Sequence, residues 1–431
     1  VTSSDPTLGL ESGRPIALRA NVGFSEFSGS ILPADLSLAS ASLDATLPPT
    51  GLRGSGQAVD VKMRDRGEDP LYEPLTGQLS ATFRDGIMTV SGPLTTPRAG
   101  QTVANAELSL ALDTLDGTAN VSTPPLVFQP GGFQPTALSE RVRGFLSNAQ
   151  GELSAHADFT IDGGKPSGTG WVSVSNFGFD TLRLGAVRGV TGRIEFDNVL
   201  KLSSPPGQEV RIGQINPGIP LENGLIAFQL ISSTEAILER AQWPFAGGHL
   251  VAGRSDWTIA GTRDVIRISA EALSLTSLVD VFNLPDLKAE GTVSGTFPVE
   301  IAGPNAYIRD AVLTADDQGG TIAYTGKAAE SASKADSRAE LAFNALRDFR
   351  FSVLEIRADG NLSGDMLITM KLAGYSPAVL QGAPFVFNIG VDSKLMQLIR
   401  SGQRATGTDW LYDVVAESVA ARNQTTPENT E

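Results

Sequence analysis

Short runs of alternating apolar and polar residues recur along most of the chain, and Gly, Pro, Asn or Asp separates each run from the next. The run 292–301 is typical, because one parity carries the apolar side chains Val293, Phe297, Val299 and Ile301. Side chains alternate between the two faces of a β-strand, so each run predicts a strand with one apolar and one polar face. The pattern indicates a long β surface that binds or carries an apolar molecule.

The spacing of these runs predicts antiparallel strands joined by tight turns. Residues 79–92 predict a hairpin that turns at Asp85-Gly86. Beyond this hairpin the main predicted strands are 151–162, 171–175, 190–198, 208–215, 224–231, 236–243, 249–260, 265–272, 289–301, 306–315, 320–326, 349–358, 361–373 and 384–391.

A few segments interrupt the strands with apolar residues at helical spacing. Ser139 is a candidate N-cap for a helix over 138–148. A helix over 338–347 is expected to bury the stripe Leu341, Ala342 and Ala345. The other predicted helices are 275–284, 393–400 and 408–422, and residues 423–431 are predicted to be a disordered tail.

Composition and charge narrow the class of protein. Of the 431 residues, 41% are apolar, which suffices for a large core and is too much for a disordered chain. The net charge is −15 and no basic face is concentrated, so we expect no nucleic-acid partner. No apolar run of about 18 residues predicts a transmembrane helix. Because the chain starts at Val1 without a signal peptide, we expect a processed form or a fragment.

Residues suited to catalysis or metal binding are scarce. The chain has no cysteine, which excludes disulfides, thiolate metal sites and Cys nucleophiles. The two histidines, His156 and His249, lie far apart in sequence and are interpreted as surface or turn residues. No nucleophile elbow, dinucleotide fingerprint or phosphate-binding loop occurs. We therefore expect no enzyme, no metal site and no cofactor.

The candidate ligand-contacting residues are apolar side chains that recur on one parity of successive strands. They are Phe159, Ile161, Ile194, Phe196, Ile226, Phe228, Leu230, Phe297, Val299, Ile301, Met366, Ile368, Met370, Leu372, Phe385, Phe387 and Ile389. Periodicity leaves two interpretations open, a closed sandwich or barrel core and an open groove. In a groove these side chains would contact acyl chains, where each buried methylene contributes ~0.8 kcal/mol.

Four segments resemble the YdbH family of AsmA-like envelope proteins. They are 189–230 (GVTGRIEFDNVLKLSSPPGQEVRIGQINPGIPLENGLIAFQL), 236–250 (AILERAQWPFAGGHL), 286–303 (DLKAEGTVSGTFPVEIAG) and 354–391 (LEIRADGNLSGDMLITMKLAGYSPAVLQGAPFVFNIGV). The resemblance covers about 140–391, and residues 1–139 share the same style with weaker motifs.

The resemblance implies both a fold and a function. Such proteins are mostly β, with an elongated antiparallel sheet curled into a hydrophobic groove, a few short helices and a C-terminal helix. They are anchored in the inner membrane by an N-terminal helix and extend through the periplasm of Gram-negative bacteria. They carry glycerophospholipids toward the outer membrane and maintain its lipid balance, and their C-terminal end works with a small lipoprotein, YnbE. The present sequence departs from this pattern because the anchor helix is absent from it.

On this basis we expect four blocks along the chain. They are an N-terminal β-groove segment (1–137), a central β-groove (138–326), a C-terminal closing block with helices (327–422) and the tail (423–431). About 20 strands spaced ~4.8 Å apart give a groove on the order of 100 Å long. The open edge of the last strand invites a partner strand, and the ends of the protein are expected to contact membranes.

Three other functions stay open at this point. The first is a structural or scaffolding β protein of the cell envelope, whose apolar faces meet each other. The second is a carbohydrate-active β-solenoid, which requires acidic residues clustered on the polar face. The third is dicarboxylate transport, a label the family has carried, which requires paired cationic side chains in a pocket. The candidate pairs, Arg183 with Arg188 and Arg347 with Arg350, fit surface charges better.

Overall fold

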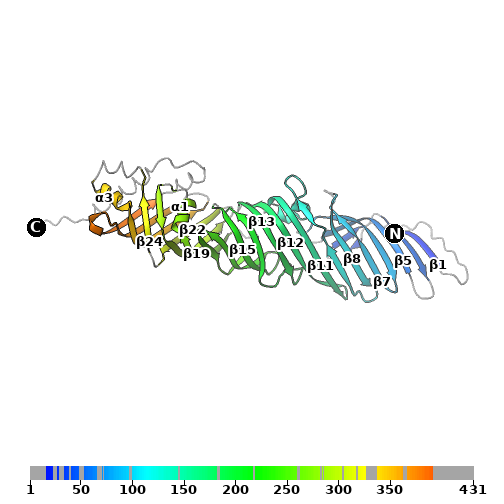
Figure 1. The fold of residues 1–431 in the computed structure, drawn as a ribbon. Coiled ribbons are helices and arrows are strands. Elements are labelled where there is room, and N and C mark those ends of the chain that lie inside the picture. Colours follow the sequence, from blue (N-terminus) through cyan, green and yellow to red (C-terminus); the bar gives the residue numbers. More distant parts are fainter. Residues whose placement is uncertain are drawn as a thin grey trace. The chain divides into compact units, whose positions relative to one another are not determined.

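The strands predicted from alternation form a large antiparallel sheet (Figure 1). A computed structural model describes residues 16–22, 27–28, 34–37, 40–47, 53–65, 70, 72–96, 100–143, 146–181, 185–216, 219–259, 263–281, 284, 286–302, 305–316, 319–326, 337–362 and 366–391. Among these residues β-structure dominates, all strands belong to one sheet that does not close, and two α-helices occur. The predicted mostly-β antiparallel fold class is confirmed.

The chain folds as two compact units. The first comprises Val1–Leu182, Ala186–Gly213 and Ala227–Ile237, and the second comprises Arg183–Gly185, Gln214–Ile226 and Leu238–Glu431. The four blocks expected from the sequence stay a prediction. The predicted helices 393–400 and 408–422 and the tail lie outside the described residues.

Most strands of the first unit come from residues up to 181. The elements there are β1 (Ile16–Val22), β2 (Phe27–Ser28), β3 (Ala34–Ser37), β4 (Ser40–Leu47), β5 (Arg53–Asp65), β6 (Leu75–Arg84), β7 (Ile87–Thr95), β8 (Thr102–Ala111), β9 (Gly117–Ser122), β10 (Leu126–Phe128), the 3₁₀ turns η1 (Pro135–Ala137) and η2 (Glu140–Val142), β11 (Ser147–Asp162) and β12 (Lys165–Thr181).

The rest of the chain continues the antiparallel pattern with two short helices. Its elements are β13 (Gly185–Phe196), β14 (Gln208–Ile215), β15 (Leu221–Leu230), β16 (Glu235–Phe245), β17 (Gly248–Ala252), β18 (Ser255–Thr258), β19 (Arg263–Ser274), α1 (Leu275–Val281), β20 (Leu287–Glu290), β21 (Thr292–Ala302), β22 (Asn305–Ala315), β23 (Gly320–Tyr324), α3 (Ser337–Leu346), β24 (Phe349–Asn361), β25 (Met366–Tyr375), η3 (Leu380–Gly382) and β26 (Pro384–Val391).

Hydrogen-bonded neighbours in the first unit run in the order β1, β4, β5, β6, β7, β8, β9, β11, β12. The predicted hairpin is confirmed, since β6 and β7 pair and both turn residues, Asp85 and Gly86, have positive φ (55° and 84°). That combination is the signature of the hairpin turn that matches strand twist. Neighbours in the second unit run β16, β17, β19, β21, β22, β24, β25, β26.

Each unit has its own apolar core. In the first unit, Phe128 is 1% exposed and contacts the rings of Phe133 and Phe177, with centroids 5.3 and 5.7 Å away. In the second unit, Phe343 of α3 packs with the strand residue Phe349, and both are buried. Helix α1 contributes its buried Leu275 to the same core. The two helices therefore cover part of the apolar side of the second unit's strands.

The helix predictions hold for two segments and fail for one. Helices α1 and α3 occupy the segments predicted for them. In α3 the buried face is Phe343, Ala345 and Leu346, whereas the predicted stripe residue Leu341 is 37% exposed. The prediction of a helix over 138–148 is wrong, because the residues of this segment that the structure describes form only the 3₁₀ turn η2 before β11 begins. Ser139 does cap that turn, accepting a hydrogen bond from the Arg141 amide.

Two predicted strands are split by the backbone. The segment 289–301 divides into β20 and β21 at Gly291, whose φ of 122° favours glycine. The segment 249–260 divides into β17 and β18 around residues 253–254. The break at Gly291 changes the partner strand, since β20 pairs with β23 while β21 pairs with β19 and β22.

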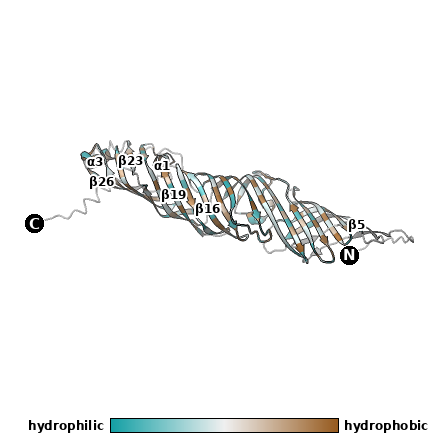
Figure 2. Ribbon diagram, turned by 60° about the horizontal axis from the view of Figure 1, so that its bottom comes forward, coloured by the Kyte–Doolittle hydropathy of each residue, from teal (hydrophilic) through white to brown (hydrophobic). Residues whose placement is uncertain are grey.

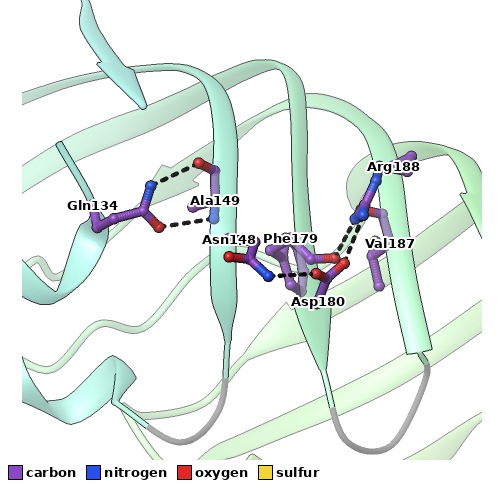
Figure 3. Close-up of polar contacts among 7 residues, drawn as sticks. All are labelled: Gln134, Asn148, Ala149, Phe179, Asp180, Val187 and Arg188. Atoms are coloured by element: carbon purple, nitrogen blue, oxygen red, sulfur yellow. Dashed lines mark hydrogen bonds and ion pairs between the residues drawn. The ribbon is translucent and has the colours of Figure 1, made fainter. Parts of the chain in front are cut away.

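A polar clamp joins β11, β12 and β13 in the first unit (Figure 3). The Asp180 carboxylate accepts hydrogen bonds from Asn148 (2.9 Å) and Arg188 (2.6 Å). Arg188 also donates to the backbone carbonyls of Phe179 and Val187. The clamp lies where β11 has a register shift and Asn148 has a positive φ of 52°. It supplies polar partners where the strand ladder is interrupted.

Candidate functional site

The strand register of the first unit brings apolar residues together in rows across neighbouring strands. One row follows the order Gly56, Ala81, Val90, Leu108, Ala119, Phe159, Gly168. The next follows Gly54, Phe83, Met88, Leu110, Gly117, Ile161, Pro166. Two of the predicted residues, Phe159 and Ile161, thus lie beside other apolar residues on both flanking strands. We call the surface made of such rows the apolar face.

The opposite parity of the same strands is polar. The row between the two apolar rows consists of Ser55, Thr82, Thr89, Ser109, Thr118, Thr160 and Ser167. Every member carries a hydroxyl group, and Thr82 and Thr89 hydrogen-bond to each other at 2.5 Å. Figure 2 shows the resulting alternation of hydrophobic and hydrophilic residues along the strands. The sheet therefore has an apolar face and, opposite to it, a polar face, as the alternation predicts. We call this polar face the wet side.

The second unit repeats this arrangement. Its longest apolar row follows Trp243, Leu250, Ala270, Gly295, Leu313, Ile356, Met370 and Ile389. A parallel row follows Ile266, Val299, Ile308, Gly360 and Met366. The other predicted residues of this unit occupy adjacent positions: Phe297 lies opposite Ile268, Leu372 opposite Phe387, and Ile368 opposite Ala358.

The predicted residues are buried or half-buried, and none is exposed. The buried ones are Ile161, Phe297, Ile301, Met366, Leu372 and Ile389. The half-buried ones include Ile194 and Phe196 on β13, Ile226, Phe228 and Leu230 on β15, and Phe385 on β26. Near α3 these side chains pack as a core, because the ring centroids of Phe387 and Phe349 lie 5.2 Å apart and Leu372 is 1% exposed. Their role in ligand contact stays a prediction.

Sequence reasoning missed Trp243, which begins the long row of the second unit. Its indole lies against Gly224 of β15, where a Cβ would be 2.1 Å from Nε1. The Nε1 atom is buried and has no hydrogen-bond partner within the part of the chain that the structure describes. The predicted strand 236–243 ends at Trp243, but the glycine that makes room for the indole lies on another strand. The apolar face therefore includes an aromatic side chain with a polar atom.

Charged groups are confined mainly to the wet side. His156 lies there, with Nε2 2.9 Å from Asp158 and its ring stacked on Trp171. Hydrogen bonds from Asn120 and then His156 lower the pKa of Asp158. Asp264 departs from the rule, since its register partner is Ile301 of the apolar face.

Within the described ranges, no group of three or more His, Cys, Asp or Glu side chains gathers as metal ligands would. None of the helices in the described residues combines the length and apolarity needed to cross a bilayer.

Comparison with protein families gives one match. The model of a family named YdbH-like, described as intermembrane phospholipid transport protein YdbH, matches residues 6–406. Comparisons with curated proteins and with solved structures found no match.

Proposed function

Because the chain belongs to the YdbH-like family of intermembrane phospholipid transport proteins, we propose that it carries glycerophospholipids along its apolar face between the inner and outer membranes. The observation that carries this proposal is the continuity of the apolar rows. The long row of the second unit crosses every strand from β16 to β26 of its hydrogen-bonded series without a charged residue. Phospholipid transport in this family also favours a periplasmic location and a transporter rather than an enzyme.

The rows suit a ligand that must keep moving. Neighbouring strands lie ~4.8 Å apart, so an acyl chain that shifts by one strand meets a similar apolar environment. Each methylene buried contributes ~0.8 kcal/mol wherever it lies along the rows. A similar free energy at successive positions gives no deep well in which a lipid would be trapped. The headgroup stays at the wet margin, where polar atoms keep their water.

We extend the proposal to the partners and the anchoring. In the proposed arrangement an N-terminal helix anchors the full-length protein in the inner membrane, and the chain supports outer-membrane lipid homeostasis. Strand β26 pairs with β25 from Pro384 to Val391. No strand among the described residues pairs with the other edge of β26, and a small outer-membrane lipoprotein is proposed to add a strand there, since an open edge offers backbone donors and acceptors.

The test combines bound lipid with transfer activity. Mass spectrometry of the purified protein is expected to detect phospholipid, and transfer of a labelled phospholipid between vesicles is expected to exceed the protein-free rate. Val299→Asp places a charge in the middle of an apolar row, between Ile266 and Ile308, and is expected to lower transfer at least tenfold. Thr296→Asp, on the wet face of the same strand, is the matched control and is expected to retain transfer.

Circular dichroism must show that both variants keep the wild-type β-content. The proposal fails if the wild-type protein holds no phospholipid and the two variants transfer lipid equally.

A structural β protein of the cell envelope is the second candidate. It is favoured by the core around α3, where apolar side chains of the strands and the helix bury each other. In that case Val299→Asp unfolds the protein and no phospholipid co-purifies. Dicarboxylate transport receives less support, because Arg188, one of its candidate residues, is held by Asp180 and two backbone carbonyls.

A further inference from the structure

The hairpin of β25 and β26 is uncharged over a long stretch. From Leu372 to Val391 the sequence contains no Asp, Glu, Lys or Arg. The connection between the two strands is the apolar loop 376–383, which includes the short turn η3. We call residues 375–384 the hairpin tip.

The tip and the strand ends next to it expose apolar side chains on the face that is polar elsewhere. Leu380 is 59% exposed, the largest fraction among the large apolar side chains that the structure describes, and Tyr375 is 43% exposed. Val353 and Val386, 45% and 46% exposed, flank Ala373 in one cross-strand row. Val353, Val386 and Tyr375 lie on this face at the turn end of the hairpin, and we group them with Leu380 of the connecting loop as the apolar patch.

The patch ends abruptly toward the middle of the same strands. The neighbouring row on this face consists of Glu355, Lys371 and Asn388. On the opposite face Phe385 stacks on Phe387, with ring centroids 5.9 Å apart. Elsewhere the hairpin has one apolar and one polar face, whereas at the tip both faces are apolar.

The backbone holds Leu380 outward in a defined conformation. Leu380, Gln381 and Gly382 have φ values of 48°, 55° and 79°, in the left-handed region that a bulky side chain such as leucine rarely adopts. Two hydrogen bonds close the turn, from Gly382 N to Val379 O (3.0 Å) and from Ala383 N to Leu380 O (3.1 Å). Val379 is 9% exposed and Ser376 is fully buried, so both fasten the loop to the sheet. An unfavourable conformation maintained in this way is typical of a functional position.

We propose that the hairpin tip inserts into the surface of a phospholipid bilayer, with Leu380 among the acyl chains and the Tyr375 ring at the headgroup level. A projecting turn with an apolar apex and a tyrosine beside it matches the interface, where aromatic rings with one polar end are enriched. The hairpin itself brings no ionised group that must be desolvated, since Leu372 to Val391 carry no charge, and Arg350, the register partner of Tyr375, lies at the level proposed for the headgroups. A protein partner is favoured less, because the hairpin itself supplies no charged side chain from Leu372 to Val391 for the polar rim of such an interface.

This inference rests on the proposed function and adds the point of exchange with a membrane. The apolar face reaches the tip through Phe385, which lies opposite Gly374. An acyl chain that leaves the rows there meets apolar groups on both sides of the hairpin. The lipid therefore enters or leaves the bilayer without crossing a hydrated surface.

The absence of cysteine makes the test simple, since each single-cysteine variant carries one label. Full-length Leu380→Cys is labelled with a polarity-sensitive dye and mixed with vesicles of phosphatidylethanolamine and phosphatidylglycerol. We expect the emission to shift to the blue and to rise at least twofold. Leu367→Cys is the matched control: Leu367 lies on β25, the strand that leads into the tip, is 58% exposed and faces Asp359 in the register. Its label is expected not to respond.

A second variant links insertion to transport. Leu380→Asp retains the turn, because Asp adopts positive φ more readily than Leu. We expect it to lower vesicle binding and phospholipid transfer at least fivefold while co-purifying phospholipid stays at the wild-type level.

Two outcomes overturn the inference. The first is a label at 380 that is already in an apolar environment without vesicles, which means that a part of this chain or a second copy covers the tip. The second is a label that ignores vesicles although phospholipid co-purifies and is transferred. Loss of the proposed function is recognised separately, by the absence of phospholipid from the wild-type protein.

Discussion

The indole of Trp243 occupies the space that a side chain at residue 224 would fill. A Cβ built on Gly224 would lie 2.1 Å from Nε1 and 2.5 Å from Cε2 of the ring, well inside van der Waals contact. The two residues come from β15 and β16, and Trp243 continues the longest apolar row of the second unit. Because Gly224 has no side chain, the Trp243 ring has room at this place on the apolar face.

Gly224→Ala is expected to displace this ring. Forcing one methyl group into an occupied space typically costs about 1–3 kcal/mol, because the ring or the strand must move. Urea unfolding monitored by tryptophan fluorescence measures the loss. Gly253→Ala is the control, since a Cβ there meets no atom within 4 Å. Equal unfolding midpoints for the two variants would contradict the packing described here.

Leu372→Ala is expected to destabilise the second unit strongly. Leu372 is 1% exposed, and removing a buried leucine side chain leaves a cavity that costs about 2–5 kcal/mol. Leu367→Ala removes the same atoms from the same strand, but that side chain is 58% exposed. Its effect is expected to stay within about 0.5 kcal/mol. Chemical unfolding of the two variants side by side checks whether the two parities of β25 face different environments.

Tyr72 is expected to lose its proton later than a free tyrosine. Burial, and then the negative charge of Asp65, raise the pKa of Tyr72 to about 12 from 10.0. Since the folded pKa is the higher one, the associated stability is complete below pH 10 and is lost as the pH rises toward 12. The difference between the absorbance titrations of the wild type and Tyr72→Phe isolates this group. A midpoint near 10 in the folded protein would exclude the burial argument.

Asp180 is expected to contribute stability that depends on pH in the acid range. Hydrogen bonds from Asn148 and then Arg188 lower its pKa below the usual 3.8. The contribution is therefore present above pH 3.8 and is lost as the pH falls through the lower, folded pKa. Asp180→Asn removes the charge, and we expect Tm to fall by about 1–2 °C at neutral pH. This difference should disappear in strong acid, and a difference that is constant with pH would argue against the clamp.

The local sequence was sufficient to predict a strand or a turn where all the residues that determine it lie within one short segment. The bounds predicted for β14 and β26 agree with the structure, and Asp85-Gly86 forms its hairpin turn. At 138–148 the prediction failed, and the residues that follow this segment are bound by a side chain from before it. Gln134 binds both the amide and the carbonyl of Ala149, at 2.9 Å each, next to the start of β11 (Figure 3). Contacts of this kind leave no periodic signal.

The choice between equivalent apolar faces also required the tertiary structure. In α3 the sequence offers Leu341 and Phe343 on different faces, and Phe343 is buried because the ring of Tyr324 lies 6.1 Å away. Similarly, alternation assigned parities to Val353, Ala373 and Val386 without showing that they are neighbours. Their common row appears only when the register of three strands is known. The apolar residues of the face were predictable, whereas the patch at the hairpin tip was not.

The alignment of like residues in cross-strand rows has a consequence for insertions and deletions. Removing one residue from the middle of β8 or β9 exchanges the two faces over the rest of that strand. The hydroxyl row containing Ser109 and Thr118 would then interrupt the apolar face. Removing two residues keeps the parity and only shortens the strand. We therefore expect the lengths of related chains to differ by even numbers within strands, or by whole hairpins. Such changes alter the size of the sheet without changing which side chains form the apolar face.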